Sequence, residues 1–173
     1  MLYHTAPLHD AAVPHFQLQH FFQDQIKCVY KAEKELFTVL GDMQQAAIME
    51  ELKKAFADYS LQIQAQLLRL EEIFGIMLIE PVPGACESIT GMIREMKRSI
   101  ADARRGNVTR DAILVLSIRK AIYYKIAAYS ALEMLADSQG MEEACNLLHL
   151  SLEEEKDSDM VLTDIAERRI KNL

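Results

Sequence analysis

The feature that most constrains the fold is residues 111–136, an apolar segment with the periodicity of an α-helix. Its apolar positions recur mostly at steps of three and four residues and so share one helical face; they are Ile118, Ile122, Tyr129, Leu132 and Ala136. Lys125 stands on that face, where a core residue is expected. A lysine there must either extend to solvent or lie against buried anions. The rest of the chain has to supply those anions if the side chain stays inside.

The composition predicts one globular domain that binds neither nucleic acid nor a membrane. The chain has 173 residues, of which 50% are hydrophobic and 26% charged, enough for a substantial core. Its net charge of −7 comes with no basic run that could attract phosphates, and no segment is apolar over the length of a membrane span. Cys28, Cys86 and Cys145 are far apart and lack CxxC spacing, which favours reduced thiols in a cytoplasmic protein over a disulfide framework.

Residues 1–15 contain two prolines and show no periodicity, so we expect an extended tail ahead of a helical domain over residues 16–173. Four histidines lie in or just after this tail: His4, His9, His15 and His20. Their spacings of five and six residues place no pair on one helical face, which favours ordinary surface histidines over a metal site.

The hydrophobic pattern predicts four long amphipathic helices, over about residues 16–40, 43–75, 111–136 and 141–171. The sequence IEPVPGACES breaks the chain after the second helix, and a short helix over residues 91–104 follows it. Neither a strand pattern nor an internal repeat is present in the sequence. Four long helices with one long connection between the second and third predict an all-α, ferritin-like four-helix bundle.

Three carboxylates interrupt apolar stripes as Lys125 does, and could meet it near the middle of the bundle: Glu33, Glu155 and Asp159. Dinuclear metal sites in bundles use a Glu from each of two helices and Glu-x-x-His from the other two. Here the histidine deep in a long helix is His149, and Asn146 occupies the position three residues before it. Lys125 also brings a positive charge to the place of a cation. The pattern is that of a metal-binding bundle whose metal has been replaced.

Several motifs together resemble one family. They are Tyr30-Lys-Ala-Glu33-Lys, Cys86 followed by Gly91-Met-Ile-Arg-Glu95, Asp111-Ala followed by Tyr124-x-Ile-Ala-Ala-Tyr129, and Leu152-Glu-Glu-Glu-Lys-x-x-Asp159 followed by Leu162-Thr. From about Leu18 to Ala166 the chain resembles the YciE/YciF type of ferritin-like bacterial stress proteins. The resemblance implies a pair of metals, held by Glu-Glu-Thr-His on the second helix, Glu-His-Tyr-Glu on the central helix and carboxylates on the others.

Carried onto this chain, the resemblance implies that most of those ligands are lost. Its acidic positions are matched by Glu33, Glu95 and Glu155. Six positions stand where the family has ligands or their neighbours and carry other residues: Leu61, Gln62, Gln64, Ile122, Tyr123 and Lys125. Such losses weaken a transition-metal site more than a change beside the ligands would.

The leading hypothesis is therefore a non-enzymatic bundle with a degenerate metal site. In it Lys125 bonds Glu33 and Glu155, and no cofactor is expected. The resemblance implies a role in bacterial stress, as a structural or interaction protein, and short bundles with wide apolar arcs favour a homodimer.

Two alternatives remain open from the sequence. In the first, Glu33, Glu95, Glu155 and Asp159 still bind manganese or iron for oxidase, peroxidase or storage chemistry, and Lys125 points away from them. In the second, the vacated cavity accepts an apolar ligand; its lining would be Leu61, Ile122 and Tyr129.

Overall fold

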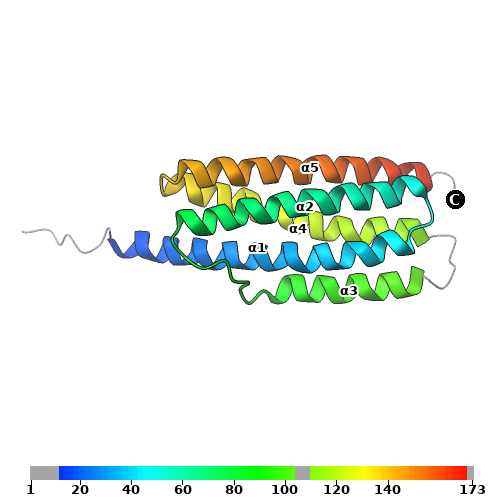
Figure 1. Ribbon diagram of the computed structural model, residues 1–173, viewed down its shortest axis with the longest axis horizontal. Helices are drawn as coiled ribbons and strands as arrows, with labels where there is room; N and C mark the ends of the chain where they lie inside the picture. Colours follow the sequence, from blue (N-terminus) through cyan, green and yellow to red (C-terminus); the bar gives the residue numbers. More distant parts are fainter. Residues whose placement is uncertain (1–11, 104–109, 171–173) are drawn as a thin grey trace, which may run out of the picture.

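The computed structural model describes residues 12–103 and 110–170, and its regular elements there are all helices. They are α1 (Ala12–Ala46), α2 (Glu50–Ile76), α3 (Glu87–Ala103), α4 (Arg110–Ser138) and α5 (Glu142–Ile170). Figure 1 shows α1, α2, α4 and α5 running alongside one another, with α3 outside them. The shorter α3 packs against α1 and α4. The predicted all-α, ferritin-like four-helix bundle with an extra helix in its long connection is confirmed. Among the described helices, none has the length and apolarity needed to cross a membrane.

The core forms from the apolar stripes that the sequence predicts. All five apolar positions of the central stripe are buried, as are those of the first helix, namely Phe22, Ile26, Val29, Leu36 and Leu40. Two apolar residues on the flank of α2, Leu61 and Leu68, are 65% and 67% exposed. One face of α2 therefore packs inward and its flank lies on the surface.

The ends of α1 differ from the prediction. The helix begins at Ala12 rather than at residue 16, which places Pro14 in the first turn, where its missing N–H is not needed. It also continues past Gly41 to Ala46. Met43 and Ala46 are buried there, and their burial offsets the cost of a helical glycine, about 1 kcal/mol. Residues 1–11 of the predicted tail lie outside the described residues.

Asp111 connects the starts of two helices. It lies in the first turn of its own helix, α4, but its carboxylate accepts hydrogen bonds from the backbone N–H groups of Ile48 (2.8 Å) and Met49 (2.9 Å). Met49 precedes α2 and its own side chain provides no cap. Asp111 is 2% exposed. It therefore supplies from α4 the anionic group that the start of α2 lacks.

The segment between α2 and α3 is attached to α1 by a disulfide. Cys28 of α1 is bonded to Cys86, so the prediction of three reduced cysteines is wrong for this pair; Cys145 is a free cysteine. The two residues are 58 positions apart in sequence but their Cα atoms are 5.3 Å apart, a relationship that spacing alone does not reveal. Nearby, the N–H of Gly84 donates to the carbonyl of Lys27 (2.9 Å). A Cβ at Gly84 would stand 2.9 Å from the Lys27 Cβ, so glycine permits this close approach.

Candidate functional site

The Lys125 side chain ends inside the bundle, with no exposed surface. Its ammonium Nζ lies 2.7 Å from Glu33 Oε2 of α1 and 2.8 Å from Glu155 Oε1 of α5. It also donates to Gln66 Oε1 (3.0 Å) and the Tyr59 hydroxyl (3.2 Å), both on α2. All four long helices thus contribute to one cluster. A lysine that extended to solvent would reach none of these partners.

Further hydrogen bonds hold the two carboxylates in place. The Tyr59 hydroxyl donates to Glu155 Oε2 (2.8 Å), and Gln66 Nε2 donates to Glu155 Oε1 (2.9 Å). On the other side, the Tyr129 hydroxyl donates to Glu33 Oε1 (2.5 Å). The other Glu33 oxygen, Oε2, forms the ion pair with the Lys125 ammonium. We call Glu33, Tyr59, Gln66, Lys125, Tyr129 and Glu155 the lysine cluster.

Burial changes the protonation of these groups. It raises the pKa of Glu33 to about 7, against the opposing effect of the Lys125 charge and with a further raising effect from Glu155. Burial alone would lower the pKa of Lys125, but the charges of Glu155 and Glu33 raise it above its ordinary value. The pKa values of Tyr59 and Tyr129 are raised well above 10, mainly by burial. Near neutral pH the cluster therefore contains a charged ammonium and a Glu33 that is partly protonated.

The other two predicted carboxylates lie elsewhere. Glu95, on α3, is exposed and pairs with Lys120 of α4. Asp159 follows Glu155 by one turn of α5 and pairs with Arg119, at 2.7 Å from its Nε. Within residues 12–103 and 110–170, no three His, Cys, Asp or Glu side chains gather as a metal site needs. The structure brings Glu33 and Glu155 together and keeps Glu95 and Asp159 apart from them.

Three of the positions carried over from the family need correction. Leu61 and Tyr123 are 65% and 54% exposed, and Gln64 is also exposed. Each helical residue is rotated by about 100° from the previous one, so a shift of one or two positions in matching a motif moves a residue from the interior to the surface. Ile122 and Lys125 are buried and Gln62 is partly buried, with its Nε2 3.2 Å from Glu155 Oε1.

On α2 the residues that face the cluster are Tyr59, Gln62 and Gln66. Gln66 was not among the predicted site residues; it is fully buried, as are the apolar residues Ile63 and Leu70 on the same face of α2. The signal was present, because a polar residue at that step interrupts the apolar stripe as Lys125 does on α4.

The predicted apolar cavity is not formed in this arrangement. Leu61 lies on the outer surface, while Ile122 and Tyr129 are fully buried in the packed interior. The Tyr129 hydroxyl is bonded to Glu33 instead of lining a void. Because Leu61 lies on the outside of the bundle and the other two residues lie inside it, the three cannot enclose one ligand.

The donor set of the lysine cluster does not fit a dinuclear metal centre. Such a centre needs several anionic ligands, and this cluster offers two carboxylates with an ammonium between them. The arrangement can hold four helices together through charge and hydrogen bonds.

Comparison with known proteins places the chain in a family. The family model described as "Domain of unknown function (DUF892)" matches residues 17–172. Protein YciF of Escherichia coli (strain K12) is 31% identical over 152 residues, which cover 86% of this chain and 90% of that protein. The crystal structure of the E. coli stress protein YciF superimposes with a TM-score of 0.84 at 29% identity, covering 90% of this chain and 98% of that one.

A second solved structure, YcfI of Rhodopseudomonas palustris, shares the fold. Its TM-score is 0.79 at 23% identity, covering 84% of this chain and 92% of that one. With the family match over nearly all described residues and the YciF alignment along most of both chains, the assignment is clear. The chain belongs to the DUF892 family and is a ferritin-like bundle of the YciE/YciF type.

Proposed function

We propose that this protein is a YciF-type bundle that works without a dinuclear metal centre and acts as a structural or interaction protein, not as an enzyme. The observation that carries the proposal is the Lys125 ammonium, 2.7 Å from Glu33 and 2.8 Å from Glu155 with all three side chains fully buried. In this proposal the single charge of the ammonium replaces the charge of the lost cations.

Charge balance supports the replacement. A divalent cation placed between Glu33 and Glu155 would stand within a few ångströms of the ammonium, and like charges repel strongly where water is excluded. Expelling Lys125 would also leave Gln66 Oε1 without the donor it has now. Metal binding would therefore have to break an arrangement that is already complete.

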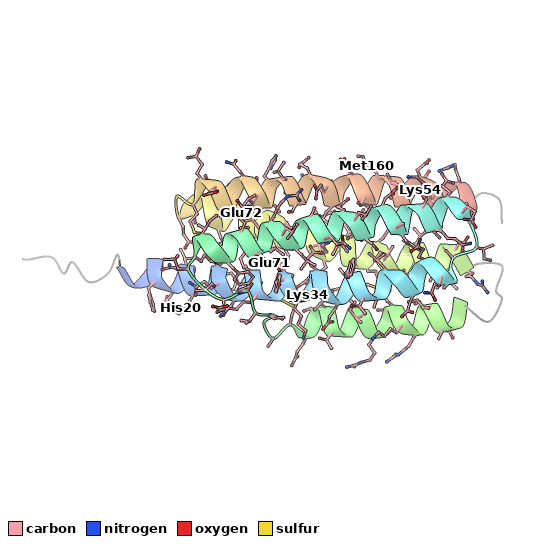
Figure 2. All side chains as sticks on the ribbon, in the orientation of Figure 1. His20, Lys34, Lys54, Glu71, Glu72 and Met160 are labelled. Atoms are coloured by element: carbon pink, nitrogen blue, oxygen red, sulfur yellow. A yellow bond between two sulfur atoms is a disulfide. The ribbon has the colours of Figure 1, made fainter. Side chains whose placement is uncertain are left out.

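The setting of this function is proposed from the family and from the surface. The E. coli relative is described as a stress protein, and we propose a stress-associated role here. Figure 1 shows α2 and α5 side by side, and both carry exposed apolar residues: Leu61, Leu68, Leu150, Met160 and Val161. Figure 2 shows Met160 on the outer side of α5. A homodimer formed through this face would cover them.

The test is the metal content of untagged protein, purified without chelator and then challenged with iron and manganese. Inductively coupled plasma mass spectrometry should find far less than one ion per chain before and after the challenge. One or more ions per chain, lost in Glu33→Gln or Glu155→Gln and retained in the surface control Glu95→Gln, would overturn the proposal in favour of a metalloprotein.

A further inference from the structure

A groove of about 690 Å³ lies between α1 and α3, outside the bundle core. We call it the α1–α3 groove. Its walls include Lys31 and Lys34 of α1 and Thr90, Ile93, Arg94 and Lys97 of α3. Its volume is within the range of small-molecule sites, about 300–1,000 Å³. Nothing in the proposed function uses it.

The groove is basic although the chain is acidic. Four cationic side chains line it against one carboxylate, Glu35, in a chain with a net charge of −7. Glu35 stands 3.7 Å from Lys31 and so neutralises at most part of this charge. Among the described residues, Arg94 and Lys97 have no carboxylate at ion-pair distance. The walls therefore attract a negatively charged ligand.

The floor of the groove is apolar. Val39 and Ile93 lie beneath it but are almost fully buried, so the apolar surface open to a ligand comes from Pro83 and from the methylene stems of the lysine and arginine side chains. The Thr90 hydroxyl is already engaged, because it accepts from Lys31 Nζ (3.1 Å) and donates to the carbonyl of Cys86 (3.0 Å). A purely inorganic anion would leave this apolar surface uncovered.

The groove is long, and its charges follow its length. From Lys31 to Val39 the α1 wall rises through eight residue steps, which is about 12 Å of helix. Figure 1 shows α3 running in the same direction beside α1, and Figure 2 shows Lys34 between the two helices. Basic groups from both helices are therefore available along an apolar strip.

We propose that the α1–α3 groove binds an amphiphilic organic anion. The apolar body of the ligand lies on Pro83 and on the methylene stems of the basic side chains, and the charged ends of Lys34, Arg94 and Lys97 hold its acidic group. A medium-length acyl carboxylate has both parts and matches the length of the groove. This site is separate from the lysine cluster, so either proposal can fail without the other.

The test uses octanoate as the probe, titrated into the full chain by isothermal titration calorimetry. Octanoate should bind more tightly than octanamide, which lacks the charge, and more tightly than inorganic phosphate, which lacks the apolar body. Arg94→Gln/Lys97→Gln should weaken octanoate binding by at least roughly tenfold, since it removes two charge-assisted contacts. The control Lys54→Gln removes one positive charge from α2, away from the groove in Figure 2, and should leave binding unchanged.

Both substituted groove residues are exposed, so the double variant should fold, which a thermal melt can verify. Absence of octanoate binding at millimolar concentration would overturn the proposal. Equal binding of octanamide would show an uncharged apolar site, and equal binding of phosphate a simple anion site; either result would also overturn it, as would a double variant that binds like the parent.

Discussion

Lys125 Nζ lies 2.8 Å from Glu155 Oε1 in the interior of the bundle, and neither side chain is exposed to solvent. Removing two charges from water is costly, so this pair need not stabilise the fold relative to apolar residues of the same shape. Removing only one partner is different, because the other charge is then left buried without compensation. The lysine cluster should therefore respond much more strongly to single substitutions than to a concerted one.

Lys125→Met should lower the free energy of unfolding by roughly 3–5 kcal/mol, although methionine is the more hydrophobic residue. Urea denaturation at neutral pH measures this. Lys120→Met, which removes an exposed lysine of the same helix, should cost less than about 1 kcal/mol. The variant Lys125→Met/Glu33→Gln/Glu155→Gln should recover part of the loss. Equal denaturation midpoints for Lys125→Met and the parent would contradict the prediction.

The raised pKa of Glu33 predicts a contribution to the free energy of unfolding that is lost as the pH rises. Its pKa is about 4.5 when exposed and about 7 in the fold, so the folded protein holds this proton over that interval while the unfolded chain releases it. The contribution is complete below pH 4.5 and is lost by about pH 7, with a size on the order of 3 kcal/mol. The difference in unfolding free energy between the parent and Glu33→Gln, measured from pH 4 to 8, should fall over that interval. If the unfolding free energies of the parent and Glu33→Gln changed in parallel with pH, the prediction would be wrong.

At alkaline pH the free energy of unfolding should fall more steeply as the pH rises. Lys125, Tyr59 and Tyr129 all have raised pKa values in the fold, so each retains its proton after the unfolded chain has released it. Their contributions are present below about pH 10 and are lost together as the pH rises further. Equilibrium unfolding from pH 9 to 12 should show a slope that Tyr59→Phe/Tyr129→Phe reduces. An unchanged slope in that variant would show that these tyrosines do not contribute.

Substitution of Asp111, a residue outside the lysine cluster, should clearly destabilise the fold. Asp111→Ala leaves the N–H groups of Ile48 and Met49 without their acceptor and should cost about 1–3 kcal/mol. Asp111→Asn keeps one acceptor oxygen and should cost less. Thermal melts compare both with Asp58→Ala, an exposed aspartate of α2 that pairs with Lys54. If Asp111→Ala destabilises the protein no more than Asp58→Ala does, water replaces the Asp111 carboxylate as the acceptor for the two N–H groups.

The sequence predicts the fold well because burial follows a simple period. The stripe through Ile118, Ile122 and Tyr129 fixes one face of α4, and Lys125 is visible as the residue that breaks it. The same logic could have found Gln66 on α2. Matching to a family motif did less well at Leu61 and Tyr123, since an error of one residue turns a side chain to the other side of a helix.

Contacts between distant segments could not be predicted in this way. Asp111 reaches across to the start of α2, 62 residues earlier at Met49, and nothing in its local sequence distinguishes this from a cap on its own helix. The ion pair between Arg119 and Asp159, which lies apart from the lysine cluster, could not be predicted either. Such pairings depend on how helices are placed against each other, which periodicity does not encode.

The Cys28–Cys86 bond is the clearest of these long-range relationships and gives a direct chemical test. Protein isolated under oxidising conditions and alkylated without reductant should be modified at Cys145 alone, and after reduction at all three cysteines. Peptide mass spectrometry identifies the modified positions. Because the bond closes a segment of 58 residues, its reduction should lower the unfolding free energy by about 2–4 kcal/mol. Cys28→Ala/Cys86→Ala should melt like the reduced parent, and Cys145→Ala like the oxidised parent. Labelling of Cys28 or Cys86 in the unreduced, folded protein would show that the two thiols are not joined.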